Sequence, residues 1–225
     1  MVAVSALPID EGDFVLDLCA APGGKSTQAG VKLNNTGLLV SNEIIKKRSE
    51  ILSENIERFG FKNTVVTNES PQKLAEKYPE FFDKIIVDAP CSGEGMFRKE
   101  PQAVTEWSVE HVESCAVRQR NILDCAVKML KKGGMLIYST CTFALEENEE
   151  NAHYLINEHG LTLQKISLEG ISEGINMPEA GRLFPHRQEG EGHFTALFKK
   201  EYGGENAEPL KKRNKDTEIK TAEKL

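Results

Sequence analysis

The stretch FVLDLCAAPGGKST, residues 14–27, joins an apolar run to a Pro-Gly-Gly loop and then to a predicted helix that begins at Ser26. The short apolar run is typical of a buried strand. The glycines let a ligand approach the backbone of the loop closely. In an open parallel sheet, ligands bind beyond the carboxyl ends of the strands, at a turn of this kind. The stretch therefore predicts a ligand-binding loop after the first strand.

The rest of the chain alternates between strand-like and helix-like segments. Nearly continuous apolar runs predict four more strands, at 37–43, 63–68, 84–90 and 135–141. Helical patterns separate or follow these strands, at 44–60, about 109–130 and 145–160. Gly133 and Gly134 are expected to close the helix that precedes the last of these strands. This alternation indicates an α/β fold, with a parallel sheet covered by helices on both faces.

Two different segments complete the chain. Residues 181–200, GRLFPHRQEGEGHFTALFKK, are expected to form a β-hairpin with its turn in EGEG, and we place this hairpin at the sheet edge. Residues 201–225 are polar and almost free of aromatic side chains, which is typical of a flexible tail. We therefore expect one folded domain, residues 1–200, followed by this tail.

The composition excludes several classes of protein. The chain has 225 residues, 39% of them hydrophobic and 28% charged, as is usual for one globular domain. It lacks an apolar run of about 18 residues and a secretory signal at its start, so we expect no membrane span and a cytoplasmic location. The five cysteines form no Cys-x-x-Cys pair, which argues against a disulfide framework and against a metal site. With a net charge of −7, a nucleic acid would need a local basic patch.

The first loop resembles the phosphate-binding loop of ATPases but departs from it at one position. That loop requires G-x-x-x-x-G-K-[ST], and Cys19 stands where its first glycine is needed. Glu43 lies 20 residues after Gly23, at the end of the next predicted strand, where an acid suits ribose hydroxyls. An adenosine cofactor fits this pattern better than a nucleotide phosphate. The alternative interpretation is a helix cap beside a surface glutamate.

Two cysteines occupy polar loops that follow predicted strands. Cys91 lies in DAPCSGEG (88–95) and Cys141 in STCTF (139–143), both at the sheet edge that carries the first loop. Cys115 and Cys125 lie on a predicted amphipathic helix, where a buried thiol is the ordinary outcome. A thiolate near an adenosine cofactor suggests covalent catalysis.

Carbon 5 of a pyrimidine is a poor nucleophile until a group adds to carbon 6, and sulfur can perform that addition. The resulting enamine can attack an electrophilic methyl group, after which a base must remove the proton from carbon 5. One carboxyl and two thiols would meet these needs, and Asp88, Cys91 and Cys141 are of those types. The residues alone do not decide which thiol attacks.

Three motifs together resemble a known family. VLDLCAAPGGKSTQ, DAPCSGEGMFRK and YSTCTFALEENE are similar to motifs of the RsmB/RsmF (NOP2/Sun) family of RNA 5-methylcytosine methyltransferases. The closing RLFPHRQEGEGHFTALFKK is most similar to the bacterial RsmF type, which acts on 16S ribosomal RNA. The resemblance runs from about residue 15 to residue 200. It implies a Rossmann-like fold dependent on S-adenosyl-L-methionine, with a mostly parallel seven-stranded sheet that contains one antiparallel strand.

The resemblance also implies an activity and its residues. The activity is methyl transfer from S-adenosyl-L-methionine to carbon 5 of a cytosine in small-subunit ribosomal RNA, through a covalent Cys–cytosine intermediate. Cys141 would be the nucleophile, Cys91 would assist product release, and Asp88 would lie near the reactive end of the cofactor. The cofactor-binding residues that the resemblance implies are Cys19, Ala20, Ala21, Pro22, Gly23, Gly24, Lys25, Glu43, Ser70 and Asp88.

The chain departs from the family pattern in two respects, and alternatives stay open. The family places an aspartate after the third strand, near the adenine, where this chain has Asn68, Glu69 and Ser70. Proteins of the RsmF type also usually carry an RNA-binding segment before the catalytic domain and another small domain after it, which is a second departure of this chain. A truncated cofactor-binding module without RNA methylation is therefore an alternative, as is transfer RNA as the substrate. We expect a monomer.

Cations close to the thiol loops are the expected RNA contacts. Arg98 and Lys99 follow the loop of Pro90 and Cys91 (88–95), which we call the Pro-Cys loop, and are the first candidates. The late hairpin and the tail supply further candidates, namely Arg182, His186, Arg187 and the basic run 211–215. Phe97 and Phe184 are expected to be able to stack on bases.

Overall fold

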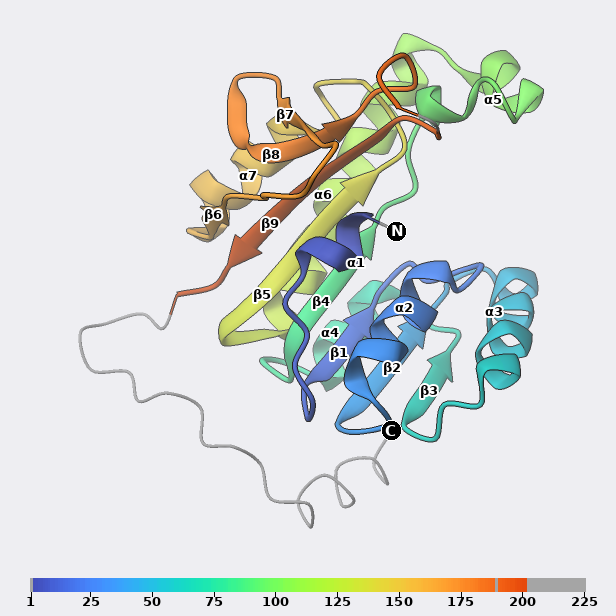
Figure 1. Cartoon of the computed structure of the whole chain (residues 1–225), viewed down its shortest axis with the longest axis vertical. Helices are drawn as coiled ribbons and strands as arrows, with labels where there is room; N and C mark the ends of the chain where they lie inside the picture. The colour runs from blue at the N-terminus through green and yellow to red at the C-terminus, as the bar shows by residue number, and fades with distance from the viewer. Residues whose placement is uncertain (1, 189, 202–225) are drawn as a thin grey trace.

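The computed structural model describes residues 2–188 and 190–201 (Figure 1). The first half of the chain contains α1 (Val2–Ala6), β1 (Phe14–Asp17), α2 (Gly24–Leu33), β2 (Leu38–Asn42), α3 (Lys46–Phe59), β3 (Thr64–Thr67), α4 (Pro71–Lys77), β4 (Phe82–Asp88), the 3-10 helix η1 (Glu94–Met96) and α5 (Pro101–Glu106). The second half contains α6 (Val109–Met129), β5 (Leu130–Thr140), α7 (Glu149–His159), β6 (Thr162–Gln164), β7 (Ser172–Gly174), β8 (Met177–Leu183) and β9 (His193–Lys199).

One twisted sheet runs through the molecule in the order β3-β2-β1-β4-β5-β9-β8-β7, and β6 pairs with β9 beside this path. The five strands from β3 to β5 are parallel, whereas β9 is antiparallel to β5. The predicted α/β, Rossmann-like fold is confirmed. The described sheet has nine strands rather than the seven expected. The extra strands β6 and β7 have three residues each and lack the apolar run that would mark them in the sequence.

Helices cover both faces of the sheet, and the alternation of side chains along the strands separates two cores. Leu16 and Val40 point to one face, where they belong to a cluster that includes Leu123 of α6. Val15 and Leu39, their neighbours along the strands, point to the opposite face, where α1 and α2 pack. Figure 1 shows α1 and α2 in front of the strands and α4 and α6 behind them. The first loop therefore leaves a strand that is buried on both sides.

The parallel arrangement brings the ends of β1, β2, β4 and β5 to one edge of the sheet. Because β9 is antiparallel to β5, it begins at this same edge, and Thr140 lies opposite Phe194. The turn before β9 therefore arrives beside the loop that follows β5.

The two glycines before the predicted strand 135–141 have a different role from the one expected. Gly133 and Gly134 lie inside β5 rather than at a helix end, because α6 ends at Met129 and the chain enters β5 directly at Leu130. A register shift between β4 and β5 accommodates these glycines, since Phe82 is opposite Leu130 but Lys84 is opposite Met135.

The predicted hairpin exists as β8 and β9, with Gly181 opposite Thr195 and Leu183 opposite His193. Its position is different, because β9 lies between β5 and β8, and the edge is formed by β7. Residues 202–225, including the basic run 211–215, lie outside the described residues.

Candidate functional site

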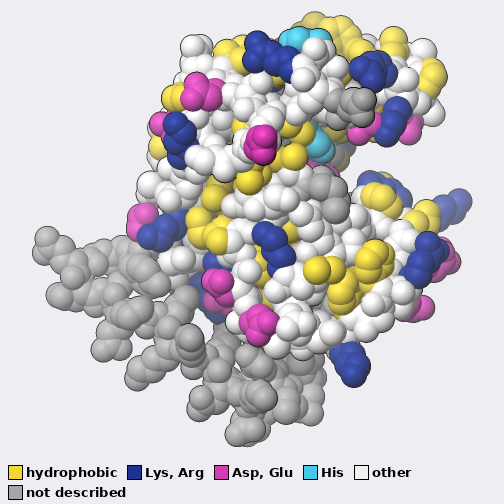
Figure 2. Space-filling view, viewed as in Figure 1, with side chains coloured by type: hydrophobic (Ala, Val, Ile, Leu, Met, Phe, Trp, Pro, Cys, Tyr) yellow, Lys and Arg dark blue, Asp and Glu magenta, His cyan; other side chains and the backbone are white. Residues whose placement is uncertain are grey.

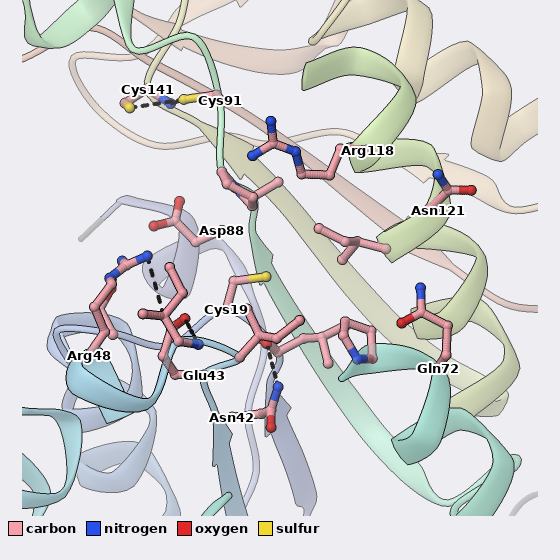
Figure 3. Close-up of a pocket in the computed structure, with 18 residues that line it drawn as sticks. Cys19, Asn42, Glu43, Arg48, Gln72, Asp88, Cys91, Arg118, Asn121 and Cys141 are labelled. Atoms are coloured by element: carbon pink, nitrogen blue, oxygen red, sulfur yellow. Dashed lines mark hydrogen bonds and ion pairs between the residues drawn. The ribbon is translucent and has the colours of Figure 1, made fainter. Parts of the chain in front are cut away.

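A pocket of about 470 Å³ lies beyond the carboxyl ends of the parallel strands. Figure 3 shows Cys91 and Cys141 at one end of it, Glu43 and Arg48 at another, and Asp88 between them. We call the first pair the thiol end and the second pair the carboxylate end. The predicted site residues that line the pocket are Cys19, Ala21, Glu43, Asp88, Cys91 and Cys141. The other lining residues are Leu18, Asn42, Ile44, Ile45, Arg48, Pro71, Gln72, Ala89, Pro90, Arg118, Asn121 and Ile122.

The first loop is anchored from beneath by a buried carboxylate. Asp17 is fully buried at the end of β1 and accepts a 2.7 Å hydrogen bond from the hydroxyl of Ser26, which in turn accepts one from Ser41. Burial raises the pKa of Asp17 to about 7. The helix α2 begins at Gly24, two residues before its predicted start. The network fixes the first turn of α2 against the ends of β1 and β2.

Only part of the first loop faces the pocket. Cys19 and Ala21 line it, whereas Ala20, Pro22, Gly23, Gly24 and Lys25 do not. Burial raises the pKa of the Cys19 thiol, so this cysteine remains a neutral wall residue. Lys25 contributes indirectly, because its Nζ lies 2.5 Å from Oδ2 of Asp88.

The carboxylate end is held by residues close to Glu43 in the sequence. Glu43 is 3% exposed, and its Oε1 accepts a 2.9 Å hydrogen bond from the backbone N–H of Ile45. Its Oε2 lies 3.4 Å from Nη1 of Arg48, and the guanidinium also donates to the backbone oxygen of Ala21. A carboxylate fixed in this way at the pocket wall can accept hydrogen bonds from ligand hydroxyls.

Ser70 does not line the pocket, contrary to the sequence-based expectation. Its hydroxyl caps α4 by accepting a hydrogen bond from the backbone of Lys73. The amide of Asn68 donates to the backbone oxygens of Glu43 and Ile44. The polar residues after β3 therefore support the loop that carries Glu43, and Pro71 and Gln72 line the pocket in their place.

The thiol end brings two sulfurs together from different loops. Sγ of Cys91 lies 3.0 Å from Sγ of Cys141, and the backbone N–H of Cys141 donates to the sulfur of Cys91. A hydrogen bond from the Cys91 thiol lowers the pKa of Cys141, and nearby Lys25 acts in the same direction. The same hydrogen bond, followed by burial, raises the pKa of Cys91, and the neighbouring Glu147 adds to this effect. Cys141 is thus the thiol that ionises first.

Asp88 lies between the two ends and is held by two partners. Its Oδ2 accepts from Nζ of Lys25, and its Oδ1 accepts a 2.6 Å hydrogen bond from the hydroxyl of Ser139. Ser139 belongs to β5, the strand that leads to Cys141. The contact fixes the end of β4 relative to the Cys141 loop.

Three chain segments meet behind the thiols in a close backbone junction. The N–H of Gly95 donates to the backbone oxygen of Cys141 at 2.8 Å, and the N–H of Gly192 donates to the oxygen of Gly95 at 3.4 Å. A Cβ atom on Gly95 would lie 2.6 Å from the oxygen of Gly192 and 2.7 Å from that of Cys141, so only glycine fits there. Nδ1 of His193 also lies 2.6 Å from the backbone oxygen of Thr140. The turn of the late hairpin therefore supports both thiol loops.

A buried polar network supports the Pro-Cys loop, and sequence reasoning did not identify it. Both carboxylate oxygens of Glu147 accept from the backbone N–H of Ser92, and Oε2 also accepts a 2.7 Å bond from the amide of Gln119. That amide binds the backbone oxygen of Pro90 as well. Burial raises the pKa of Glu147. The acid lies in the quoted motif YSTCTFALEENE, but nothing in the sequence distinguishes it from its exposed neighbours Glu146 and Glu150.

The expected RNA-binding cations have different environments. Lys99 forms an ion pair with Glu191, whereas Arg98 lines a separate hollow at the surface. Arg182 is 1% exposed and binds Glu149 through two nitrogens, so it is a structural residue rather than an RNA contact. Phe97 lines neither the pocket nor this hollow.

The two remaining cysteines do not line the pocket. Cys115 and Cys125 are buried, as predicted for thiols on the apolar face of α6. Within residues 2–188 and 190–201, the structure contains no cluster of three or more side chains suited to hold a metal ion. No helix in the same ranges is both long and apolar enough to pass through a membrane.

Comparison with known proteins finds relatives that match most of the chain. The sequence profile of the family described as 16S rRNA methyltransferase RsmB/F matches residues 4–199. Ribosomal RNA small subunit methyltransferase F of Vibrio vulnificus is 40% identical over 206 residues, which cover 89% of this chain and 44% of that protein. The corresponding protein of Aeromonas hydrophila is 38% identical over 86% of this chain and 42% of its own length. The chain thus spans about half the length of the curated relatives it matches.

Solved structures agree with this comparison. The crystal structure of NSun6 from Pyrococcus horikoshii with SFG has a TM-score of 0.81 and 36% identity, over 88% of this chain and 50% of that one. A methyltransferase homolog protein from the same organism has a TM-score of 0.74 and 27% identity, over 88% and 65%. The profile covers the first loop, both thiol loops and the late hairpin, which are the segments that form the pocket and the junction behind it. The chain belongs to the 16S rRNA methyltransferase RsmB/F family.

Proposed function

We propose that this chain transfers a methyl group from S-adenosyl-L-methionine to carbon 5 of a cytosine in small-subunit ribosomal RNA. The observation that carries the proposal is the pairing of Cys91 and Cys141, with sulfurs 3.0 Å apart, in the pocket that also contains Glu43 and Asp88. The family and the printed names of the relatives support ribosomal RNA as the substrate.

The residues of the pocket fit the cofactor. Its volume of about 470 Å³ lies within the usual range for small-molecule sites. Glu43, buried and fixed at its carboxylate end, suits the ribose hydroxyls, and Cys19 and Ala21 would form the wall beside it. When bound, the cofactor supplies an electrophilic methyl group. Asp88, between the two ends, would then lie near the reacting atoms.

Cys141 has the properties of the attacking thiol. Its lowered pKa raises the fraction of thiolate at neutral pH, and the thiolate is the nucleophilic form. Its sulfur would form a bond to carbon 6 of the cytosine. The electron pair of the double bond between carbons 5 and 6 moves toward carbon 5. Carbon 5 would then bond to the methyl group as the bond between that group and the sulfonium breaks, with S-adenosyl-L-homocysteine as the leaving group.

Cys91 has the properties of a helper rather than an attacker. Its raised pKa keeps it protonated at rest, when it donates to the Cys141 thiolate. After methylation, the proton on carbon 5 must leave before the bond between carbon 6 and Cys141 can break and restore the aromatic ring. Once the sulfur of Cys141 is bonded to carbon 6, the thiolate that chiefly raises the pKa of Cys91 is gone, so Cys91 can lose its own proton. As a thiolate beside Cys141 it can then accept the proton from carbon 5, and the electron pair of that C–H bond re-forms the double bond between carbons 5 and 6 and expels the sulfur of Cys141.

The proposal is tested by incubating the protein with labelled S-adenosyl-L-methionine and either deproteinised 16S ribosomal RNA or assembled small subunits. Bisulfite sequencing then locates methylated cytosines. We expect label at a defined cytosine in at least one of the two substrates, and none with the Cys141→Ala variant. A folded protein that binds the cofactor but labels neither substrate would contradict the proposal and favour a binding module without transfer activity.

A further inference from the structure

A second hollow, of about 370 Å³, opens on the surface beside the thiol loops. Its lining comes from two of the segments that meet at the junction, with Phe143 in the loop after β5 and Phe184, Pro185 and His186 in the loop after β8. Arg98, which follows η1, completes it. We call these five residues the aromatic hollow. It shares no lining residue with the pocket, yet Phe143 is only two positions from Cys141.

The rings of the aromatic hollow present flat faces. Phe143 and Phe184 are nearly parallel, with an angle of 11° between their planes and 6.0 Å between their centroids. His186 packs against Phe184 at 5.5 Å, and the guanidinium of Arg187 lies 5.8 Å from the centre of the Phe184 ring. Parallel aromatic faces beside a guanidinium are the arrangement on which unpaired nucleobases stack.

The structure holds the Phe143 side of the hollow rigidly. The backbone N–H of Phe143 donates to Glu94 at 2.9 Å, and its backbone oxygen accepts from the buried Arg182 at 3.1 Å. The ring itself fills the space that the missing side chain of Gly192 leaves, because a Cβ there would lie 2.1 Å from Cζ of Phe143. A platform that is already ordered costs little conformational entropy when a ligand binds.

The charges around the aromatic hollow favour an anionic ligand. Arg98 and Arg187 are exposed, and within the described part of the chain neither forms an ion pair. This differs from Lys99, which is paired with Glu191. Figure 2 shows basic and histidine side chains beside hydrophobic ones at the top of the molecule, where the loop between β8 and β9 lies in Figure 1. The guanidinium of Arg187 donates a 3.2 Å hydrogen bond to the hydroxyl of Ser172, which leaves its charge uncompensated. In a chain of net charge −7, two guanidinium groups that have no carboxylate partner among the described residues and lie beside aromatic rings form a local patch that suits a nucleotide.

We propose that the aromatic hollow binds one unpaired nucleobase of the RNA, adjacent to the target cytosine, with the base stacked on Phe184 and the neighbouring phosphates contacted by Arg98 and Arg187. The inference rests on the proposed function, because it takes RNA as the ligand and the Cys141 pocket as the place of the target base. It adds a second position at which the enzyme requires single-stranded RNA.

The test uses a fluorescein-labelled RNA heptamer, with one central cytosine flanked by adenosines, and a series in which one nucleotide at a time is abasic. Fluorescence anisotropy gives the dissociation constant of each oligonucleotide without cofactor or methyl transfer. For the wild-type protein we expect one flanking abasic position to weaken binding by at least about fivefold. Removal of the central base tests binding in the Cys141 pocket, whereas removal of a flanking base tests binding in the aromatic hollow. If the proposed function fails, the first change has no effect on affinity; if only this inference fails, the second has none.

Variants at Phe184 identify the stacking surface. Phe184→Leu keeps an apolar side chain but removes the aromatic face, and we expect it to bind the intact heptamer at least about fivefold more weakly and to lose sensitivity to the flanking abasic position. Phe184→Tyr should restore both, which excludes a simple folding defect. Phe59→Ala is the matched control, because Phe59 is an exposed ring that stacks on Phe61 at the end of α3.

Two results would overturn the inference. One is a wild-type protein whose affinity is the same for every flanking abasic oligonucleotide. The other is a Phe184→Leu variant that stays as sensitive to the abasic position as the wild type. The Arg98→Gln variant should weaken binding of all oligonucleotides equally and reduce the dependence of affinity on salt, as expected for a phosphate contact.

Discussion

The carboxylate end and the thiol end of the pocket are held in place by interactions of different range. At the carboxylate end, Glu43 is fixed by Ile45 and Arg48, which lie within five residues of it. At the thiol end, the backbones of Gly95, Cys141 and Gly192 come from three distant segments and meet directly. The comparison shows that the Glu43 carboxylate takes its own partners from nearby sequence, although Asn68 supports its loop from the end of the next strand, whereas the reactive end depends on backbone contacts between three distant segments.

The largest expected effect comes from removing the attacking sulfur at the thiol end. Cys141→Ala should lower methyl transfer by at least about a thousandfold, because the variant lacks the nucleophile assigned to the bond with carbon 6. Binding of S-adenosyl-L-methionine, measured by calorimetry, should stay within about twofold of wild type because the carboxylate end is intact. Cys125→Ala is the control for loss of a buried thiol. Appreciable transfer by Cys141→Ala would show that the two sulfurs have been assigned the wrong roles.

A large effect is expected from disturbing the junction without touching either thiol. In Gly95→Ala the new Cβ would meet two backbone oxygens at less than 3 Å, so the loops that carry Cys91 and Cys141 must move apart. A displacement of about 1 Å at reacting groups can cost about a hundredfold in rate, and we expect a loss of that size. The cofactor affinity should change little. Gly60→Ala is the control for general destabilisation, because its Cβ would meet no atom but its φ of +68° strains the backbone at the end of α3, away from the junction.

The outcome of the Gly95→Ala experiment discriminates between local and long-range support of the thiols. If that variant retains the full rate and the thermal stability of wild type, the junction does not position the sulfurs, and the contrast between the two ends of the pocket fails.

A moderate effect is expected at the carboxylate end. Glu43→Gln keeps the shape of the side chain but removes the charge that accepts hydrogen bonds from ligand hydroxyls. Because hydrogen bonds to charged groups contribute about 1.5–3 kcal/mol, we expect the dissociation constant of S-adenosyl-L-methionine to rise by at least about tenfold. The alkylation rate of Cys141 should not change. A variant that alters thiol reactivity as much as cofactor affinity would show that the two ends are coupled.

The smallest effect concerns the pH dependence of thiol reactivity. The Cys91 hydrogen bond lowers the pKa of Cys141, so the rate of iodoacetamide alkylation at Cys141 should rise with pH and level off, with a midpoint below that of an ordinary cysteine thiol. Cys91→Ala removes the donor and should move the midpoint upward, which lowers the rate at neutral pH about fivefold. Mass spectrometry of the alkylated peptide measures the rate at Cys141 alone. A midpoint that is unchanged, or lower, in Cys91→Ala would contradict the direction of the hydrogen bond.

Much of the fold and the thiol end could be predicted from sequence because both depend on simple periodic features. Buried parallel strands produce apolar runs, and each run ends at the same edge of the sheet, so Cys91 and Cys141 had to share a rim. Glu43 lies at the same edge as the first loop because β1 and β2 are parallel neighbours. The separation of these thiols from Cys115 and Cys125 follows from their polar, turn-rich surroundings.

The features that escaped prediction depend on tertiary contacts that leave no local signal. The short strands β6 and β7 add to the sheet through backbone pairing rather than through an apolar pattern. The sequence predicts a surface cation at Arg182. The structure instead buries its guanidinium, because Glu149 of α7 supplies a buried carboxylate partner. Ser70 follows the strand that should supply the adenine contact, yet its hydroxyl serves as a helix cap. Glu147 differs from its neighbours only in being covered by Ser92 and Gln119.

The central claim, that Cys141 attacks the cytosine and Cys91 releases it, is tested most directly by trapping the covalent intermediate. Each variant is incubated with S-adenosyl-L-methionine and small-subunit ribosomal RNA, and protein–RNA adducts are resolved by denaturing electrophoresis. Cys91→Ala should accumulate an adduct, because it can form the bond to carbon 6 but is slow to break it, and Cys141→Ala should form none. An adduct in Cys141→Ala and its absence in Cys91→Ala would reverse the roles of the two thiols and contradict the account.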